Sequence, residues 1–282
     1  LVAALAICTV LIARPAHVDR DAERSSSRDI VLCLDVSGSA LPYDRAVIET
    51  YLELVSHFRG ERIALSIFNS TSRTVFPLTD DYDLVSSQLT KAAGALRGVE
   101  SQDDIDKMSD KDYQKIADWL EGTQNRKNST SLIGDGLVSC AAMIPGFAYG
   151  DTSGAARQRP ASIVLATDNV ASGTPTYSLV QALDMAEASH ISVDGLFSGP
   201  RQSEGDATTT EMKQQIESRG GTFLTQSGSS DINELVRQID SRRTSESRRS
   251  SQAALIDAPG WWTLMLVVLL AIWMILAWRL RR

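Results

Sequence analysis

The sequence has few of the residues on which disulfide-rich and histidine-dependent proteins rely. Its 282 residues include three cysteines and three histidines, and aromatic residues account for only 6%. Three cysteines give no disulfide framework. Cys8, Cys33 and Cys140 each lie within an apolar run, and for the last two we expect buried, inert thiols rather than a functional pair.

The chain also lacks an excess of positive charge. Lys and Arg number 28 against 35 Asp and Glu, which gives a net charge of -7 and a pI near 5.1. Sequence-independent binding to nucleic acid needs a basic face that displaces counterions from phosphates. No basic stripe with interleaved aromatic residues occurs, so we expect no nucleic-acid partner.

Common catalytic motifs are missing as well. The chain has neither the Gly-x-Ser-x-Gly elbow of a serine hydrolase nor a Gly-rich loop that would cradle phosphates. We place His17 in an arm near the membrane, His57 on a helix that faces away from the strand ends, and His190 at the opposite rim. None of them is then positioned as a general base, and we predict that the protein is not an enzyme.

What the chain does have is an apolar strand that runs directly into a loop rich in oxygen ligands. Residues 29–35 read as a buried strand, and Asp35, Ser37 and Ser39 alternate at its carboxyl end. Three oxygens of one short turn can converge there on a hard cation such as Mg²⁺, Mn²⁺ or Ca²⁺. The absence of nitrogen and sulfur ligands disfavours zinc.

Ser, Gly and Asp are also the residues that bend a chain and begin a helix, so this motif alone does not decide between the two uses. Two further segments favour the metal. Thr130 and Ser131 place hydroxyls just before a predicted helix at 132–144, and the apolar strand 162–167 ends in Asp168. Three loops of one fold thus offer oxygens to the same edge of a sheet.

On these motifs, residues 28–241 resemble a von Willebrand factor type A domain. The five positions of its metal-ion-dependent adhesion site (MIDAS) match Asp35, Ser37, Ser39, a hydroxyl near Ser131, and Asp168. In that family the hydroxyls approach the metal, the two Asp act mostly through water, and one coordination position stays open for an acidic group of a partner. Ser131 stands where a Thr is usual and Thr130 lies one residue early, so either hydroxyl could be the ligand.

The order of elements predicts an α/β fold, a doubly wound and mostly parallel sheet with helices on both faces. Residues 62–69 and 73–78 read as a hairpin that adds an antiparallel edge strand. A final helix is expected at 231–239. An acidic insert at 97–127 interrupts the rhythm, and we expect Trp119 to pack it onto the domain, with a direct contact to a partner as the weaker alternative.

The two ends of the chain suggest membrane anchoring. The apolar run at 260–278 carries Trp at its ends and is followed by arginines, which predicts a transmembrane helix and a cytoplasmic C-terminus. The predicted organisation is a truncated transmembrane helix at 1–13, a linker at 14–27, the type A domain at 28–241, a tether at 242–259, a transmembrane helix at 260–278 and a cytoplasmic tail at 279–282. For residues 1–13 a signal peptide is the weaker alternative.

This arrangement places the domain outside the cytoplasm and makes the lipid bilayer a partner. Helix, type A domain and helix in succession also resemble bacterial membrane proteins of the aerotolerance (Bat) group. That resemblance implies a MoxR-type AAA ATPase system, or other type A membrane proteins, as partners in assembling a complex.

The function that the sequence predicts is therefore a membrane-tethered, metal-dependent module that binds a carboxylate of another protein. Two alternatives remain. A Mg²⁺-dependent phosphohydrolase of the aspartyl type also begins with an Asp after its first strand, but its usual second Asp is Ser37 here, which removes the general acid. The other alternative is a structural anchor whose metal site is vestigial.

Overall fold

The structure is a computed structural model in two units, Ser27–Arg243 and a second one formed by Leu1–Ser26 with Thr244–Arg282. The residues that the structure describes are 16–18, 28–58, 60–147, 159–225, 255–257 and 260–280.

The larger unit is built on a six-stranded sheet in the order β4-β3-β2-β5-β6-β7. All neighbours pair in parallel except β3 and β4, which form an antiparallel pair at one edge. The predicted mostly parallel sheet and its hairpin are confirmed. The strands are β2 (Asp29–Asp35), β3 (Arg62–Phe68), β4 (Ser72–Thr79), β5 (Ala161–Thr167), β6 (Ile191–Phe197) and β7 (Phe223–Leu224).

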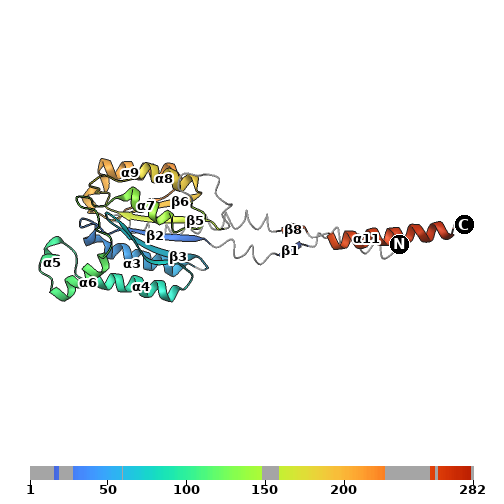
Figure 1. Cartoon of the computed structure of the whole chain (residues 1–282), viewed down its shortest axis with the longest axis horizontal. Coiled ribbons are helices and arrows are strands. Elements are labelled where there is room, and N and C mark those ends of the chain that lie inside the picture. Colours follow the sequence, from blue (N-terminus) through green and yellow to red (C-terminus); the bar gives the residue numbers. More distant parts are fainter. Residues whose placement is uncertain are drawn as a thin grey trace. The chain divides into compact units, whose positions relative to one another are not determined.

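Helices cover both faces of the sheet (Figure 1). They are α3 (Leu41–His57), α4 (Tyr82–Ala95), α7 (Ile133–Ala141), α8 (Leu179–Ala188) and α9 (Ala207–Ser218), with a short 3-10 helix η1 (Arg201–Gly205) before α9. The helix predicted at 132–144 is present as α7, which begins one residue later and ends three residues earlier. The predicted helix at 231–239 lies outside the described residues.

The central strand β2 is buried along its whole length because both faces carry helices. Its side chains alternate between two cores: Ile30, Leu32 and Leu34 pack with α3 and α4, whereas Val31 and Cys33 pack with α7 and α8. This explains why the strand reads as a continuous apolar run. The alternation also directs its last residue, Asp35, toward the side of α7.

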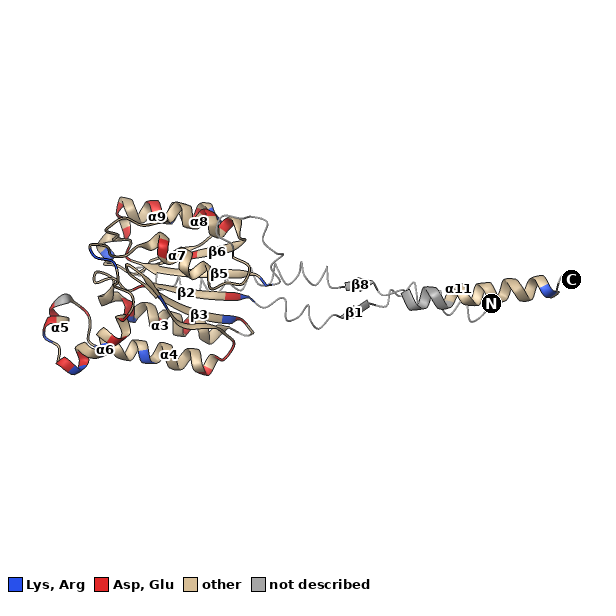
Figure 2. Ribbon diagram, in the orientation of Figure 1, with Lys and Arg blue, Asp and Glu red and all other residues tan. Residues whose placement is uncertain are grey.

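The insert forms two helices, α5 (Gln102–Asp106) and α6 (Asp110–Leu120), which carry most of its acidic residues (Figure 2). Trp119 is partly buried and packs against the core under α4. The Arg73 guanidinium lies 5.8 Å from the centroid of the Trp119 ring, and its Nη2 donates a 2.6 Å hydrogen bond to the Trp119 carbonyl. These contacts attach the insert to β4, while a role of Trp119 in partner binding stays a prediction.

The amino end of β2 is fixed by a charge cluster. Asp29 is 2% exposed and receives hydrogen bonds from Arg62, from Nε to Oδ1 at 2.8 Å and from Nη2 to Oδ2 at 2.7 Å. The Nε of Arg159 lies 3.2 Å from the same Oδ1. Figure 2 shows acidic and basic segments meeting at the amino ends of β2 and β3. A buried carboxylate is thus neutralised by two cations.

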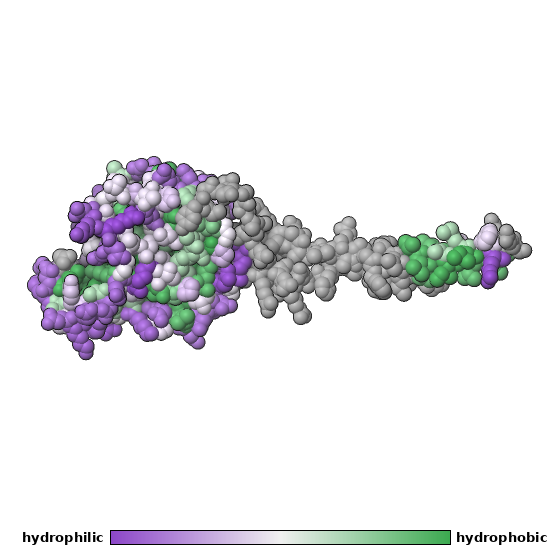
Figure 3. All heavy atoms as spheres, in the orientation of Figure 1, coloured by the Kyte–Doolittle hydropathy of each residue, from purple (hydrophilic) through white to green (hydrophobic). Residues whose placement is uncertain are grey.

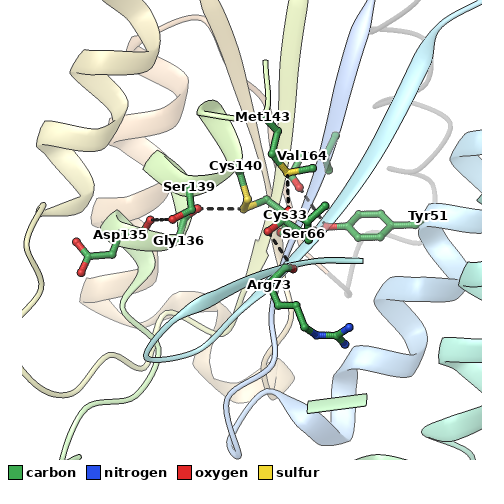
Figure 4. The surroundings of a disulfide bond; sticks show 11 residues. Cys33, Tyr51, Ser66, Arg73, Asp135, Gly136, Ser139, Cys140, Met143 and Val164 are labelled. Atoms are coloured by element: carbon green, nitrogen blue, oxygen red, sulfur yellow. Dashed lines mark hydrogen bonds between the residues drawn. A yellow bond between two sulfur atoms is a disulfide. The ribbon is translucent and has the colours of Figure 1, made fainter. Parts of the chain in front are cut away.

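A disulfide bond joins Cys33 of β2 to Cys140 of α7 (Figure 4). The expectation of two inert thiols is therefore wrong. Cys33 points to the face that α7 covers, and the two Cα atoms are 6.1 Å apart, within the range that a disulfide bridges. Because 107 residues separate the two cysteines, their meeting depends on the packing of α7 and leaves no mark in the local sequence.

The second unit contains two short antiparallel strands, β1 (Ala16–Val18) and β8 (Leu255–Asp257), and the helix α11 (Gly260–Leu280). The strands lie within segments that were predicted as linker and tether. Large apolar side chains of α11 such as Val267, Trp273 and Trp278 are exposed (Figure 3). In the described residues, no helix meets the combined length and apolarity that crossing a bilayer requires. The predicted transmembrane segments stay predictions.

Candidate metal centre

The three predicted oxygen-bearing loops meet at the carboxyl edge of the sheet. β2 and β5 are parallel neighbours with Leu34 opposite Ala166, so the strands end side by side and bring Asp35 and Asp168 to the same edge. Ser131 completes the group from the loop before α7. Such an edge is where ligands bind in doubly wound sheets.

Asp35 is the fully buried centre of this site. Its Oδ1 accepts a 3.0 Å hydrogen bond from the Ser37 backbone N–H. Its Oδ2 accepts hydrogen bonds from the hydroxyl of Ser131 and, at 2.6 Å, from the hydroxyl of Thr167. Burial raises the pKa of Asp35 to about 6, the hydrogen bonds from Ser131 and Thr167 oppose that rise, and the charge of Asp168 adds to it. No cationic side chain is among the causes of this shift.

The two predicted serines follow directly on the loop that leads into α3. The Ser37 and Ser39 hydroxyl oxygens lie 3.2 Å apart, with Ser37 buried and Ser39 exposed. The Ser37 carbonyl accepts hydrogen bonds from the N–H groups of Ala40 and Leu41, which begins the helix. This turn holds the two hydroxyls side by side, and the Ser37 N–H fixes it to Asp35.

The structure distinguishes between the two hydroxyls that were left as alternatives in the second loop. The Thr130 hydroxyl donates a 2.8 Å hydrogen bond to Oδ1 of Asn69, whereas that of Ser131 donates to Asp35. The same Asn69 oxygen accepts the Ser131 N–H at 2.9 Å, and Ser131 adopts the left-handed conformation with φ 50°. Asn69 therefore holds this loop so that Ser131, and not Thr130, joins the carboxylate.

Asp168 supplies an oxygen that lacks a partner. The side chain is 4% exposed, and its Oδ1 accepts a 3.0 Å hydrogen bond from the Val170 N–H. Its Oδ2 is buried and has no hydrogen-bond partner among the described residues. Burial raises the pKa of Asp168, and the hydrogen bonds from Ser39 and Val170 partly oppose the rise. A buried carboxylate oxygen without a partner is costly unless a cation or water satisfies it.

Three features at this edge were not foreseen from the sequence. Thr167 and Asn69 position Asp35 and Ser131, as described above. The third is Asp44 in the first turn of α3, which is fully buried. Its signal in the sequence is a carboxylate on the helix face that otherwise carries apolar residues, and it could have been found by noting that break in the pattern.

The donor set fits a hard divalent cation. Its members are hydroxyl and carboxylate oxygens, and the unpartnered oxygen of Asp168 leaves room for a further interaction. In the described part of the chain, no three His, Cys, Asp or Glu side chains are grouped closely enough to hold an ion by themselves. A site here would depend on its serines, as the resemblance to the type A domain implies.

A hollow of about 240 Å³ is lined by Ser70, by Arg126 and by residues of α7. Arg126 lines it and forms a 3.2 Å ion pair with Asp135, which also accepts hydrogen bonds from the N–H groups of Thr176 and Tyr177. The Arg126 side chain is 47% exposed. A cationic group thus lies on the surface near the loop that carries Ser131.

No known family profile matches the chain, and no curated protein matches it. Several solved structures are similar to it. The conserved hypothetical protein BatB from Bacteroides thetaiotaomicron is 17% identical over 79% of this chain and 99% of that chain, with a TM-score of 0.48. An aerotolerance-related membrane protein from Bacteroides fragilis is 16% identical over 75% of this chain and 99% of that chain, with a TM-score of 0.43.

A third similar structure is proximal thread matrix protein 1 from the mussel byssus, described with a zinc-occupied MIDAS motif. It is 16% identical, and the match covers 76% of this chain and 46% of that chain with a TM-score of 0.44. At such values neither the family nor the metal use of these proteins transfers to this chain. The doubly wound sheet is observed directly, and membership of the type A family stays a prediction.

Proposed function

We propose that the larger unit is a divalent-metal-dependent protein-binding module. Asp35, Ser37, Ser39, Ser131 and Asp168 would hold Mg²⁺, with Mn²⁺ or Ca²⁺ as substitutes. The single observation that supports this most is that three loops bring two buried carboxylates and three hydroxyls to one edge of the sheet, where one buried oxygen of Asp168 has no partner among the described residues.

The chemistry of the donor set suggests what the ion would bind. Neutral hydroxyl ligands neutralise little of the charge of a cation. An incoming carboxylate therefore gains much of its binding energy from the metal. Ser39 is exposed, which gives a ligand access from solvent. The partner is therefore proposed to present an Asp or Glu side chain.

Binding is favoured over catalysis by the positions of the histidines. His57 lies in the last turn of α3, where its Nδ1 is 2.8 Å from the Glu53 carbonyl oxygen, and His190 precedes β6. Both lie toward the amino ends of the strands, away from Asp35. A phosphohydrolase would need a general acid beside Asp35, where Ser37 stands instead.

The disulfide supports a location outside the cytoplasm, since such bonds persist in oxidising compartments and are rare in the cytosol. The exposed apolar side chains of α11 support attachment to a membrane. A MoxR-type ATPase system, or another type A membrane protein, would then be reached through the membrane segments or further subunits.

The test is calorimetric titration of the full chain with Mn²⁺ and Mg²⁺, comparing the wild type with Asp35→Ala and Asp168→Ala. We expect one-site binding that both substitutions abolish. No binding by the wild type at millimolar ion would overturn the proposal and favour the structural anchor. Turnover of a generic phosphoester that Asp35→Ala removes would favour the phosphohydrolase.

A second experiment addresses the ligand. Proteins captured by the immobilised wild-type chain with Mn²⁺ are compared with those captured after chelation and by Asp35→Ala. A partner that requires both the ion and Asp35 should lose binding when one of its acidic residues is replaced by Asn or Gln. A partner that tolerates every such replacement would contradict recognition through a carboxylate.

A further inference from the structure

Asp44 occupies a position that the amphipathic pattern of α3 assigns to an apolar residue. The buried face of the helix carries Leu41, Val47, Ile48, Tyr51, Leu54 and Val55, and Asp44 lies on the same face. A carboxylate on the face that packs against a sheet opposes the hydrophobic stabilisation of that face. Such a residue therefore requires a specific explanation.

The side chain of Asp44 is buried without a compensating partner in the described part of the chain. It is 0% exposed, and neither of its oxygens has a hydrogen-bond partner among the described residues. The buried Asp29, in contrast, has two arginines. A buried charge is normally paired or bound to a metal, and Asp44 is not paired.

The geometry of α3 puts Asp44 at the same height along the sheet as the loop that follows Asp35. The Tyr51 hydroxyl donates to the carbonyls of Cys33 at 3.3 Å and Val164 at 3.1 Å. Asp44 precedes Tyr51 by two helical turns, which is about 10 Å toward the carboxyl edge at 1.5 Å per residue. Asp35 lies two residues beyond Cys33, about 7 Å in the same direction.

The electrostatics agree with this placement. After burial itself, the charges of Asp35 and Asp168 are the causes that raise the pKa of Asp44 above its ordinary value. The backbone links them closely, because the Asp44 N–H donates to the Ala40 carbonyl at 3.1 Å, directly after the loop of Ser37 and Ser39. The charges of Asp35 and Asp168 thus reach the buried carboxyl group of Asp44.

We propose that Asp44 is a positioning residue of the metal centre. It would accept hydrogen bonds from water bound to the ion, on the side of α3, and supply a third negative charge. A direct ligand is disfavoured because the three acids do not form a group that could hold one ion by themselves. This inference rests on the proposed function, since it requires that the site bind a cation.

The experiment measures the Mn²⁺ dissociation constant and the thermal midpoint of the metal-free full chain for Asp44→Asn and Asp44→Leu. Loss of a group that holds the outer shell of a metal typically weakens affinity about 10–100-fold. We expect that range for Asp44→Asn and an equal or larger loss for Asp44→Leu. The thermal midpoint of the metal-free variants should not fall, because each substitution removes an uncompensated buried acid.

Asp29→Asn is the matched control, since it alters a buried aspartate at the opposite end of β2. It should lower the thermal midpoint and leave the Mn²⁺ dissociation constant unchanged. Wild-type affinity in both Asp44 variants would overturn the inference while leaving the proposed function intact. Absence of Mn²⁺ binding by the wild type would overturn both. If Asp44→Asn fails to fold, Asp44→Leu decides, because it suits the apolar face.

Discussion

The strand β2 carries a buried aspartate at each end, and the two have opposite surroundings. Asp29 at the amino end is held by Arg62 and Arg159. In the described part of the chain, Asp35 at the carboxyl end accepts hydrogen bonds from neutral groups alone, and the carboxyl groups of Asp44 and Asp168 interact with it electrostatically. At the amino end of β2 the buried carboxylate is compensated by positive charge, whereas at the carboxyl end acidic groups are in excess. The comparison distinguishes a carboxylate that is paired within the fold from carboxylates that we propose to interact with a cation.

The largest expected effect is that of Asp35→Ala on metal binding. The substitution removes the carboxylate on which Ser37, Ser131 and Thr167 converge, and we expect Mn²⁺ affinity to fall by more than about 100-fold. Calorimetry measures the affinity, and far-UV circular dichroism checks that the variant is folded. An unchanged dissociation constant would show that the acidic edge has no role in binding an ion.

In the metal-free chain, the excess of acidic groups at the carboxyl edge of the sheet should make the free energy of unfolding depend on pH. The pKa of Asp35 is raised from 3.8 to about 6, so the folded state holds this proton more tightly than the unfolded state. The resulting stabilisation is complete below about pH 4 and is lost as the pH rises through about 6, by on the order of 2–3 kcal/mol. Asp44 acts in the same direction.

Urea unfolding of the chelated protein at several pH values measures this loss. The variant Asp35→Asn should show a smaller dependence on pH, and added Mn²⁺ should restore stability near neutral pH. The opposite result would be a gain of stability by the wild-type protein between pH 4 and 6 in the presence of chelator. That result would mean that the carboxylates at the carboxyl edge are compensated by positive charge, as Asp29 is at the amino edge.

At the amino end, Asp29→Asn should act on stability alone. Breaking a buried ion pair leaves uncompensated charge, but Arg62 and Arg159 are partly exposed, so we expect a loss of about 1–3 kcal/mol. Denaturant unfolding gives this value. If the substitution also weakened Mn²⁺ binding, the two ends of β2 would not be independent.

The smallest expected effect separates the two adjacent hydroxyls of the second loop. Ser131→Ala should weaken Mn²⁺ binding about tenfold or more, while Thr130→Val should change it by less than about threefold, because only Ser131 contacts Asp35. Parallel titrations of the two variants measure this ratio. Equal effects would assign the ligand role to the loop as a whole.

Much of this site could be predicted because its signals are local. The strand that ends in Asp35 and the strand that ends in Asp168 are apolar runs followed by acids, and parallel pairing then brings the acids to one edge. The motif Asp35, Ser37, Ser39 lies within one turn. These features need only the chain's periodicity and the rule that parallel strands end together.

The unforeseen contributors depend on packing between distant segments. Asn69 reaches Thr130 and Ser131 across 61 and 62 residues, and Thr167 reaches Asp35 across 132. The register that produces these contacts is not encoded near any of the residues. The choice between Thr130 and Ser131 likewise depended on Asn69, which no local pattern indicates.

The disulfide between Cys33 and Cys140 also changes the covalent topology of the domain. It closes a loop that contains β3, β4, α3 and α4 together with the whole acidic insert. A protease that cut the exposed insert once would open this loop but would not separate the two pieces of the chain. Asp35 and Ser131 lie inside the closed loop, near its two ends. After such a cut they would belong to different pieces of the chain, and the disulfide bond would still join those pieces covalently.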